Sequence, residues 1–204
     1  MALSTKQKIV NAAGQILVSE GHRSLSMRRV AAACGISVGN LTYHFPTADR
    51  LLVAVIQNML DGYGEQLKRY ETLGAPEGQD ILDQVIEFII RDAVTSTTSS
   101  LMIELWAMAK HDASKAKYVN MAYEMGSQVI KTLILQVSPA TSEAVAQKAA
   151  VTMLVFSEGS TALFSRQHNL GYEAEDMIGL ASQTIRAMLA PPPVKRGKRV
   201  NNSQ

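Results

Sequence analysis

The amino-acid sequence predicts an all-α fold, and three observations lead to this prediction. Apolar residues recur at intervals of three and four along most of the 204-residue chain, as they do on one face of an α-helix. Aromatic residues make up only 5%, while aliphatic residues, Ala and Met dominate the apolar set, and this composition favours packed helices over a β-sandwich. No stretch shows the alternation of a half-buried strand. We therefore expect nine helices.

The first three predicted helices are closely spaced. The first runs from Lys6 to Ser19, and two short helices follow at residues 26–34 and 37–45. Ser26 and Ser37 are placed to cap the two short helices, because a Ser oxygen can accept an orphan N–H of the first turn. Gly35 lies where the second helix must stop and turn, a position that favours a residue without Cβ.

These two short helices have the layout of a helix-turn-helix whose second helix enters a major groove. Their inner positions are apolar: Val30, Ala31, Cys34, Ile36 and Leu41. Their outer positions are Arg28, Arg29, Val38, Gly39, Asn40, Thr42, Tyr43 and His44. Small residues at the start of the second helix allow a close approach, Asn can read a base edge, and Tyr and His can reach phosphates.

Six longer helices are predicted from apolar periodicity, caps and breaks. They span residues 48–70, 79–95, 101–110, 113–137, 143–167 and 173–189. Phe45-Pro46 ends the third helix, because a proline restricts the residue before it. The polar run from Thr95 to Ser100 is interpreted as a break. Pro191 begins a proline-rich stretch that ends regular structure, and residues 191–204 are expected to be a disordered basic tail.

Charge is unevenly distributed, although the net charge is only +2. Residues 1–50 carry six Lys and Arg against two acidic residues, residues 51–190 carry ten against sixteen, and residues 191–204 carry four basic residues. A basic front and an acidic middle predict a polyanionic partner for the front only. The basic tail could add nonspecific attraction to DNA or serve only as a solubilising segment.

Several function classes find no support in the sequence. No apolar run reaches the roughly 18 residues of a membrane span, and a signal peptide is not apparent, so we expect a cytoplasmic protein that does not bind a membrane. The single cysteine, Cys34, excludes an internal disulfide. Four scattered histidines share no metal-ligand spacing, and no phosphate loop or nucleophile motif is present. We expect no catalytic residue, metal or cofactor, with a helical enzyme as the competing class.

Several motifs that follow one another along the chain together resemble a known family. The helix-turn-helix is followed by Gly39-Asn-Leu-Thr-Tyr-His-Phe-Pro46 and then by Thr47-Ala-Asp-Arg-Leu-Leu52. This arrangement, over about residues 6–56, resembles the TetR (tetracycline repressor) family of transcriptional regulators. Thr42 departs from the family, which often carries Tyr there. The rest of the chain resembles the family only in its helical character and its length.

The resemblance implies a homodimer with nine helices per subunit. The first three helices would bind an operator half-site, the fourth would link them to the core, the fifth to seventh would surround a small-molecule pocket, and the last two would form the dimer interface. It also implies three regions: a helix-turn-helix DNA-binding domain at 1–46, a helical ligand-binding and dimerisation domain at 47–190, and the tail at 191–204.

Three sets of site residues follow as expectations. For double-stranded operator DNA, Val38, Gly39 and Asn40 would face base edges, and Lys6, Ser26, Arg28, Ser37, Tyr43 and His44 would hold the backbone. The effector pocket would be lined by Phe88, Met102, Glu104, Trp106, Met121, Met125 and Phe156, with Phe164 as a further apolar candidate and His111, Tyr123 and Glu158 as further polar ones. The dimer interface would use Val151, Leu154, Val155, Gly159, Ala162, Ile178, Ala181 and Ile185.

Each set also has a simpler interpretation. The outer positions of the helix-turn-helix could be a solvated surface, and the apolar pocket residues could be ordinary core. Cys34 could be a redox sensor, although a small buried hydrophobe is the commoner role. The function that the sequence predicts is a ligand-responsive repressor, released from its operator by a small, largely apolar molecule. The alternative is a constitutive DNA-binding protein without a ligand.

Overall fold

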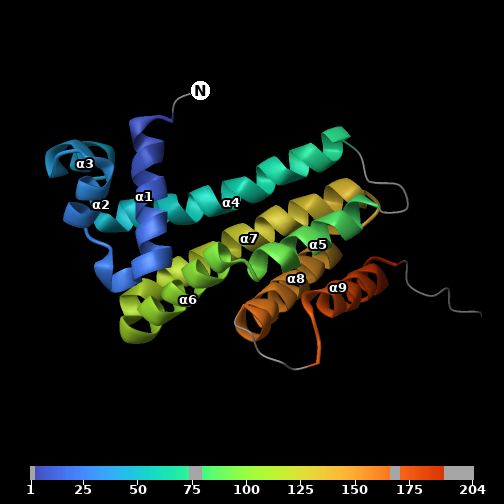
Figure 1. Ribbon diagram of the computed structural model, residues 1–204. Coiled ribbons are helices and arrows are strands. Elements are labelled where there is room, and N and C mark those ends of the chain that lie inside the picture. Colours follow the sequence, from blue (N-terminus) through green and yellow to red (C-terminus); the bar gives the residue numbers. More distant parts are fainter. Residues whose placement is uncertain (1–2, 74–79, 166–170, 191–204) are drawn as a thin grey trace, which may run out of the picture.

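The computed structural model describes residues 3–73, 80–165 and 171–190, and this part of the chain is entirely helical. Figure 1 shows its nine α-helices. They are α1 Thr5–Glu20, α2 Met27–Cys34, α3 Val38–His44, α4 Ala48–Leu73, α5 Ile81–Ala93, α6 Ser96–His111, α7 Ala116–Val137, α8 Glu143–Phe164 and α9 Ala174–Leu189. Two short 3₁₀ turns, His22–Ser24 and Ala113–Lys115, precede α2 and α7. The predicted fold class is confirmed.

The predicted break at Thr95–Ser100 is wrong, because helix α6 begins there. Thr95 is the N-cap, and its Oγ1 accepts a hydrogen bond from the N–H of Thr98 at 3.2 Å. Hydroxyl residues favour a helix start as much as a loop, since their side chains can replace the missing helical partners. Ser99 is buried within the first turn of the same helix. The polar run therefore starts a helix instead of separating two.

Smaller differences affect further helix ends, among them those of α5, α7 and α8. Helix α5 starts after Asp80, whose carboxylate accepts the N–H of Asp83 at 2.9 Å. Helix α7 starts at Ala116, after the 3₁₀ turn, and α8 ends at Phe164. The prediction of a disordered basic tail at 191–204 lies outside the described residues.

Two apolar clusters hold the described helices together. The first joins α1, α2 and α3 to the first half of α4, to α6 and to the start of α7. The second joins α5, the end of α7, α8 and α9. The first cluster crosses the predicted boundary between residues 46 and 47, because Leu51 and Leu52 pack in it with Leu41. The two-domain division of residues 1–190 therefore stays a prediction.

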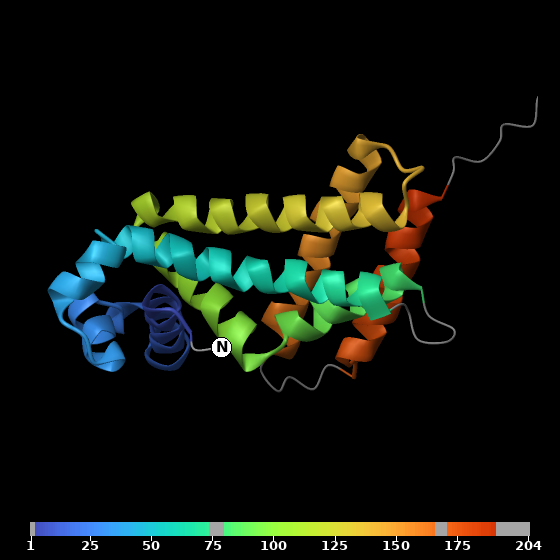
Figure 2. The same cartoon turned by 90° about the horizontal axis from the view of Figure 1, so that it is seen from above.

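Helix α4 extends from the front of the molecule along its body (Figures 1 and 2). It packs against α1 near its start and against α7 further along. Asp49, in its first turn, pairs with Lys115 at 3.0 Å and with Lys117 at 3.6 Å. Helix α4 thus contacts both α1 and α7, the first and the last helix of the first apolar cluster. None of the helices in the described ranges is long and apolar enough to cross a membrane.

Candidate functional site

Helices α2 and α3 form a tightly held helix-turn-helix. Ser26 Oγ accepts the N–H of Arg29 at 3.2 Å, and Ser37 Oγ accepts the N–H of Asn40 at 3.1 Å. Gly35 adopts φ 66° and ψ 30°, a left-handed conformation that costs a residue with Cβ about 1–2 kcal/mol. Its N–H bonds back to Ala31 and Ala32 and closes the end of α2. Both predicted caps and the predicted turn are present.

The outer face of α3 presents a compact set of exposed residues. Val38 is 40% exposed and Tyr43 is 85% exposed, while Gly39 and Asn40 are also exposed. His44 is half-buried, and its ring stands edge-on to Tyr43 with 5.3 Å between centroids. Leu41 and Phe45 point the other way and are buried. The first turn of the helix therefore offers backbone and small side chains at the surface, which suits insertion into a groove.

The remaining predicted DNA-binding residues surround this face. Ser26, Arg28 and Lys6 are exposed, and the Lys6 ammonium lies 5.8 Å from the centre of the Phe45 ring. Arg29, by contrast, pairs with Glu20 at 2.6 Å, and the hydrogen bond from Arg29 lowers the pKa of that carboxyl. The other acidic residue of the first fifty, Asp49, is paired with Lys115 and Lys117. The basic surface predicted for this region is therefore not interrupted by an unpaired carboxylate.

Besides its apolar contacts, helix α6 holds this front region through one carboxylate. Glu104 Oε2 accepts the backbone N–H of His22 at 2.7 Å and lies 2.6 Å from His22 Nδ1. Desolvation would raise the pKa of Glu104, but the hydrogen bonds from His22 outweigh it and the pKa lies below its ordinary value. Gly21, with φ 81°, places its Cα hydrogens against the same carboxylate, where a Cβ would lie 3.3 Å from both oxygens. Glu104 was predicted to be a pocket residue, and that prediction is wrong because its carboxylate faces the 3₁₀ turn.

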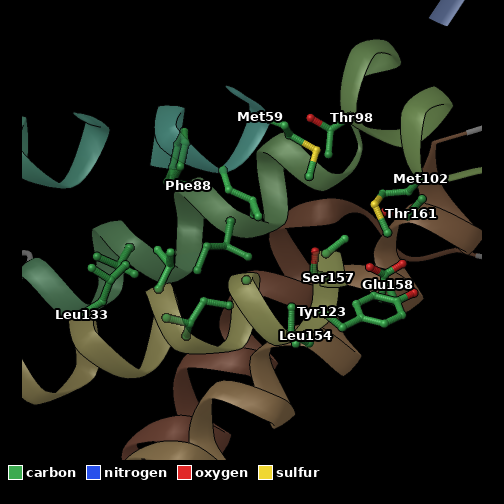
Figure 3. Close-up of a pocket in the computed structure, with 17 residues that line it drawn as sticks. Met59, Phe88, Thr98, Met102, Tyr123, Leu133, Leu154, Ser157, Glu158 and Thr161 are labelled. Carbon is green, nitrogen blue, oxygen red and sulfur yellow. The ribbon is translucent and has the colours of Figure 1, made fainter. Parts of the chain in front are cut away.

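A small cavity lies between five helices in the body of the molecule (Figure 3). Its volume is about 60 Å³. Helix α7 forms one wall, and α4, α5, α6 and α8 form the others. The lining residues are Met59, Leu60, Val85, Phe88, Ile89, Thr98, Met102, Ala122, Tyr123, Gly126, Val129, Ile130, Leu133, Leu154, Ser157, Glu158 and Thr161.

Polar groups gather at one end of this cavity. Figure 3 shows the Glu158 carboxylate beside the Tyr123 hydroxyl, with Thr161 and Met102 close by. Burial raises the pKa of Glu158 to about 7, and the Tyr123 hydroxyl offsets this only in part. The indole N–H of Trp106 donates to the Tyr123 oxygen at 2.7 Å from behind the wall. An ionisable group thus faces an otherwise mainly apolar space.

The structure brings together only part of the predicted pocket set. Phe88 and Met102 line the cavity, as do Tyr123 and Glu158. Trp106, Met121 and Met125 pack against the first apolar cluster, and Phe156 packs against the second, so these four, together with His111 and Phe164, do not line the cavity. The wall residues that the prediction missed lie at spacings of three and four on α7: Ala122, Gly126, Val129, Ile130 and Leu133. Their spacing was visible in the sequence, but nothing there distinguished a cavity wall from ordinary core.

A wider, open groove borders the cavity on the side of the helix-turn-helix. It lies between α1, α4, α5 and α6 and has a volume of about 810 Å³. Met59, Phe88 and Thr98 line both the groove and the cavity. These three side chains form the partition between the two spaces, so their displacement would join them.

Helices α8 and α9 carry a separate exposed apolar surface. We call it the α8–α9 face, made of Val151, Val155, Ala162, Leu163 and Leu180, all exposed in the single chain. Val155 is 67% exposed, whereas Ala181 and Ile185 are fully buried. The predicted dimer contacts at Ala181 and Ile185 are therefore wrong, because both side chains are used inside the chain. Gly159 and Ile178 are half-buried, and Leu154 lines the cavity.

Residues 9–55 match the family model described as bacterial regulatory proteins, tetR family. The front of the chain is therefore similar to members of this family. The match covers α2 and α3 completely, together with most of α1 and the start of α4, and therefore falls on the capped helix-turn-helix described above.

Two curated transcriptional regulators match part of the chain. The transcriptional regulator CymR of Pseudomonas putida is 26% identical over 139 residues, which cover 67% of this chain and 66% of CymR. UidR of Escherichia coli K12 is 33% identical over 89 residues, which cover 44% of this chain and 43% of UidR. The chain thus spans just under two thirds of CymR and less than half of UidR.

Solved structures extend the likeness in fold to nearly the whole chain. A candidate TetR-family regulator from Rhodococcus sp. has a TM-score of 0.71 at 23% identity, with 92% of this chain and all of that chain covered. A TetR regulator from Legionella pneumophila has a TM-score of 0.64 at 20% identity, with 90% and 99% covered. These likenesses show that the body as well as the front has the family's fold.

Proposed function

We propose that this protein is a homodimeric, DNA-binding transcriptional repressor that a small molecule releases from its operator. The observation that carries this proposal is the course of α4. Its first half packs with α3 in the first apolar cluster, and further along Met59 and Leu60 line the cavity. The same helix thus contacts both the DNA-reading helices and the space for an effector.

The DNA-binding part of the proposal rests on α3. Gly39 and Asn40 are exposed at its first turn, and Arg28 is exposed on α2. Asn40 would read a base edge in the major groove, while Arg28, Lys6 and Tyr43 would hold phosphates on either side. The buried Leu41 fixes the orientation of α3 against the body.

Release by an effector follows from the size of the cavity. A volume of about 60 Å³ is well below the 300 Å³ or more of ordinary ligand pockets. A ligand of useful size must therefore move lining side chains, and Met59, Phe88 and Thr98 are the partition towards the open groove. Movement of Met59 shifts α4, and movement of Met102 shifts α6, which holds the front through Glu104 and His22. Both routes lead to the helix-turn-helix.

Two copies would pair through the α8–α9 face. Val151 and Val155 lie one turn apart on α8, with Ala162 and Leu163 two turns further along. An isologous contact would cover this apolar surface in both subunits. Pairing would also set the distance between the two helix-turn-helix units. That distance must match the spacing of the two operator half-sites.

The structural neighbours support a ligand without identifying it. The multidrug-binding protein EbrR, which has a TM-score of 0.63 with this chain, is known as a complex with imidazole. A constitutive DNA-binding protein is the alternative, but it gives no role to a cavity with a buried carboxylate. A helical enzyme has less support, because the curated relatives are transcriptional regulators.

DNA selection from a random pool tests the proposal. The full-length protein should enrich a short palindrome, and fluorescence anisotropy should show strong dependence on salt. Arg28→Ala should lower the slope of log affinity against log salt by about 0.9, because one phosphate contact is lost. Lys148→Ala, an exposed change on α8, is the control and should leave the slope unchanged. Absence of any enriched duplex at low salt would refute DNA binding.

A further inference from the structure

The cavity contains a carboxylate oxygen that nothing in the described chain satisfies. Glu158 Oε2 is buried and accepts no hydrogen bond, yet Glu158 lines the cavity. An acceptor that is withdrawn from water without a partner costs free energy, and the cost is larger for an ionised group. Natural sequences avoid such groups unless they have a use. The position of Glu158 therefore points to a molecule that enters the cavity.

The neighbouring polar side chains do not supply the missing donor. The Thr161 hydroxyl donates to the carbonyl of Ala93 at 3.0 Å, and the Thr98 hydroxyl donates to Asp92 at 2.9 Å. The Tyr123 hydroxyl accepts from Trp106 and turns its own hydrogen to the Glu158 carboxylate, whose pKa it lowers in part, but Glu158 Oε2 remains without a hydrogen bond. Tyr123 is the other titratable side chain among the described lining residues, and no Lys, Arg or His lines the cavity with them. Among the described lining residues, none supplies a counter-charge for Glu158.

We propose that the effector of this protein carries a protonated amine on a compact apolar body, with the nitrogen donating to Glu158 Oε2. This inference rests on the proposed function and specifies the chemistry of its ligand. The aliphatic wall formed by Val85, Ile89, Ile130 and Leu133 takes the apolar body. A charge-assisted hydrogen bond in such a space is stronger than a neutral one. A carboxylate ligand is disfavoured wherever Glu158 is ionised, because two like charges would then share a site without a cation among the described lining residues.

Proton competition adds a second property to this site. Because burial raises the pKa of Glu158 to about 7, a proton and an ammonium group compete for the same carboxylate in the physiological range. The ionised fraction at pH 8 is about ten times that at pH 6 when the pKa is near 7. Besides Glu158, the titratable groups near the site are Tyr123 on α7 and Asp92 behind Thr98; neither α4 nor α6 contributes one to the lining. Affinity for an amine should therefore rise about tenfold from pH 6 to pH 8.

Matched sets of small probes test this proposal with the full-length protein. Each set keeps one apolar body and changes the head group: phenylethylamine, phenylethanol and phenylacetate, with hexyl and adamantyl sets in the same three forms. Isothermal titration calorimetry gives the affinities. We expect the amine to bind at least about tenfold more tightly than the alcohol in at least one set. Preference for the alcohol or the carboxylate in every set, or binding of no amine, overturns the inference.

Two substitutions locate the effect. Glu158→Gln keeps the shape but removes the charge, and it should weaken the best amine about tenfold or more and abolish the pH dependence. Glu124→Gln removes an equal charge from an exposed position on α7 and should change neither. An unaltered amine affinity in Glu158→Gln, with the variant folded as judged by circular dichroism, also overturns the inference.

The proposed function can fail separately. If an alcohol or a carboxylate binds and releases DNA, the proposed repressor function stands. Only the proposal of an amine effector is then wrong. If the amine binds through Glu158 but leaves DNA binding unchanged, the proposed ligand site stands. The proposed release of the operator by that ligand is then wrong.

Discussion

The helix-turn-helix and the cavity differ in how their functional residues come together. In the helix-turn-helix, residues 26 to 45 form the whole motif, and its caps bond within three residues of themselves. The cavity is lined by five helices. Met59 and Glu158 both line it, although about half of the chain separates them in the sequence. One site is built by local interactions and the other by tertiary packing.

This difference shows which properties of a regulator of this kind can vary independently. The local motif needs a turn glycine, two caps and a buried leucine, so its sequence is readable and matches a family model over residues 9–55. The cavity needs only a correct total volume and one well-placed carboxylate, which many sequences satisfy. Under the proposed function, ligand chemistry can therefore change while the DNA-reading part stays the same.

The largest expected effect tests the local motif. Leu41 is fully buried between α3 and the rest of the first apolar cluster, so Leu41→Ala should destabilise the protein by about 2–5 kcal/mol through lost packing and a cavity. Urea unfolding measures this. Val38→Ala, at an exposed position on the same helix, should change stability by less than about 0.5 kcal/mol. Equal effects of the two changes would contradict the orientation of α3.

A smaller effect is expected where the two regions meet. Glu104→Gln removes the charged acceptor of His22 and should cost about 1–2 kcal/mol at pH 7. Because the pKa of Glu104 in the folded state lies below its ordinary 4.5, its contribution is present above that pH and is lost as the pH falls through the folded value. Denaturant curves at pH 7 and pH 4 should show a smaller difference between variant and parent at pH 4. A difference that does not shrink would remove the carboxylate from this role.

A second pH-dependent effect concerns the cavity in the absence of ligand. Glu158 has a raised pKa of about 7 in the folded state, so the folded protein holds a proton that the unfolded chain releases above about pH 4.5. Stability should therefore fall as the pH rises from 4.5 to 7. Glu158→Gln avoids this cost, and its Tm should exceed that of the parent by a few degrees more at pH 8 than at pH 5. A constant Tm difference across this range would show that the carboxyl is not buried as described.

Much of the fold and the local geometry of the helix-turn-helix could be predicted from residues alone. Ser26, Gly35 and Ser37 have specific local roles, and each occurs as expected. The hydroxyl run after Thr95 was misread, because Ser and Thr favour both loops and helix starts. Most of the predicted pocket residues do not line the cavity, for a different reason. Glu104 and Glu158 are both single acidic residues in apolar helices, and only the packing partner shows that one meets His22 and the other meets a cavity.

The amino-acid sequence by itself determined the helices, the capped turn and the family resemblance, since these depend on contacts between residues a few positions apart. The tertiary structure alone decided which apolar faces close on each other. It buried Ala181 and Ile185 inside the chain, left Val151 and Val155 exposed, and placed the Glu158 carboxylate in a cavity with no cation among the described lining residues. Apolar burial is non-directional, so periodicity can identify a buried face but cannot identify what it is buried against.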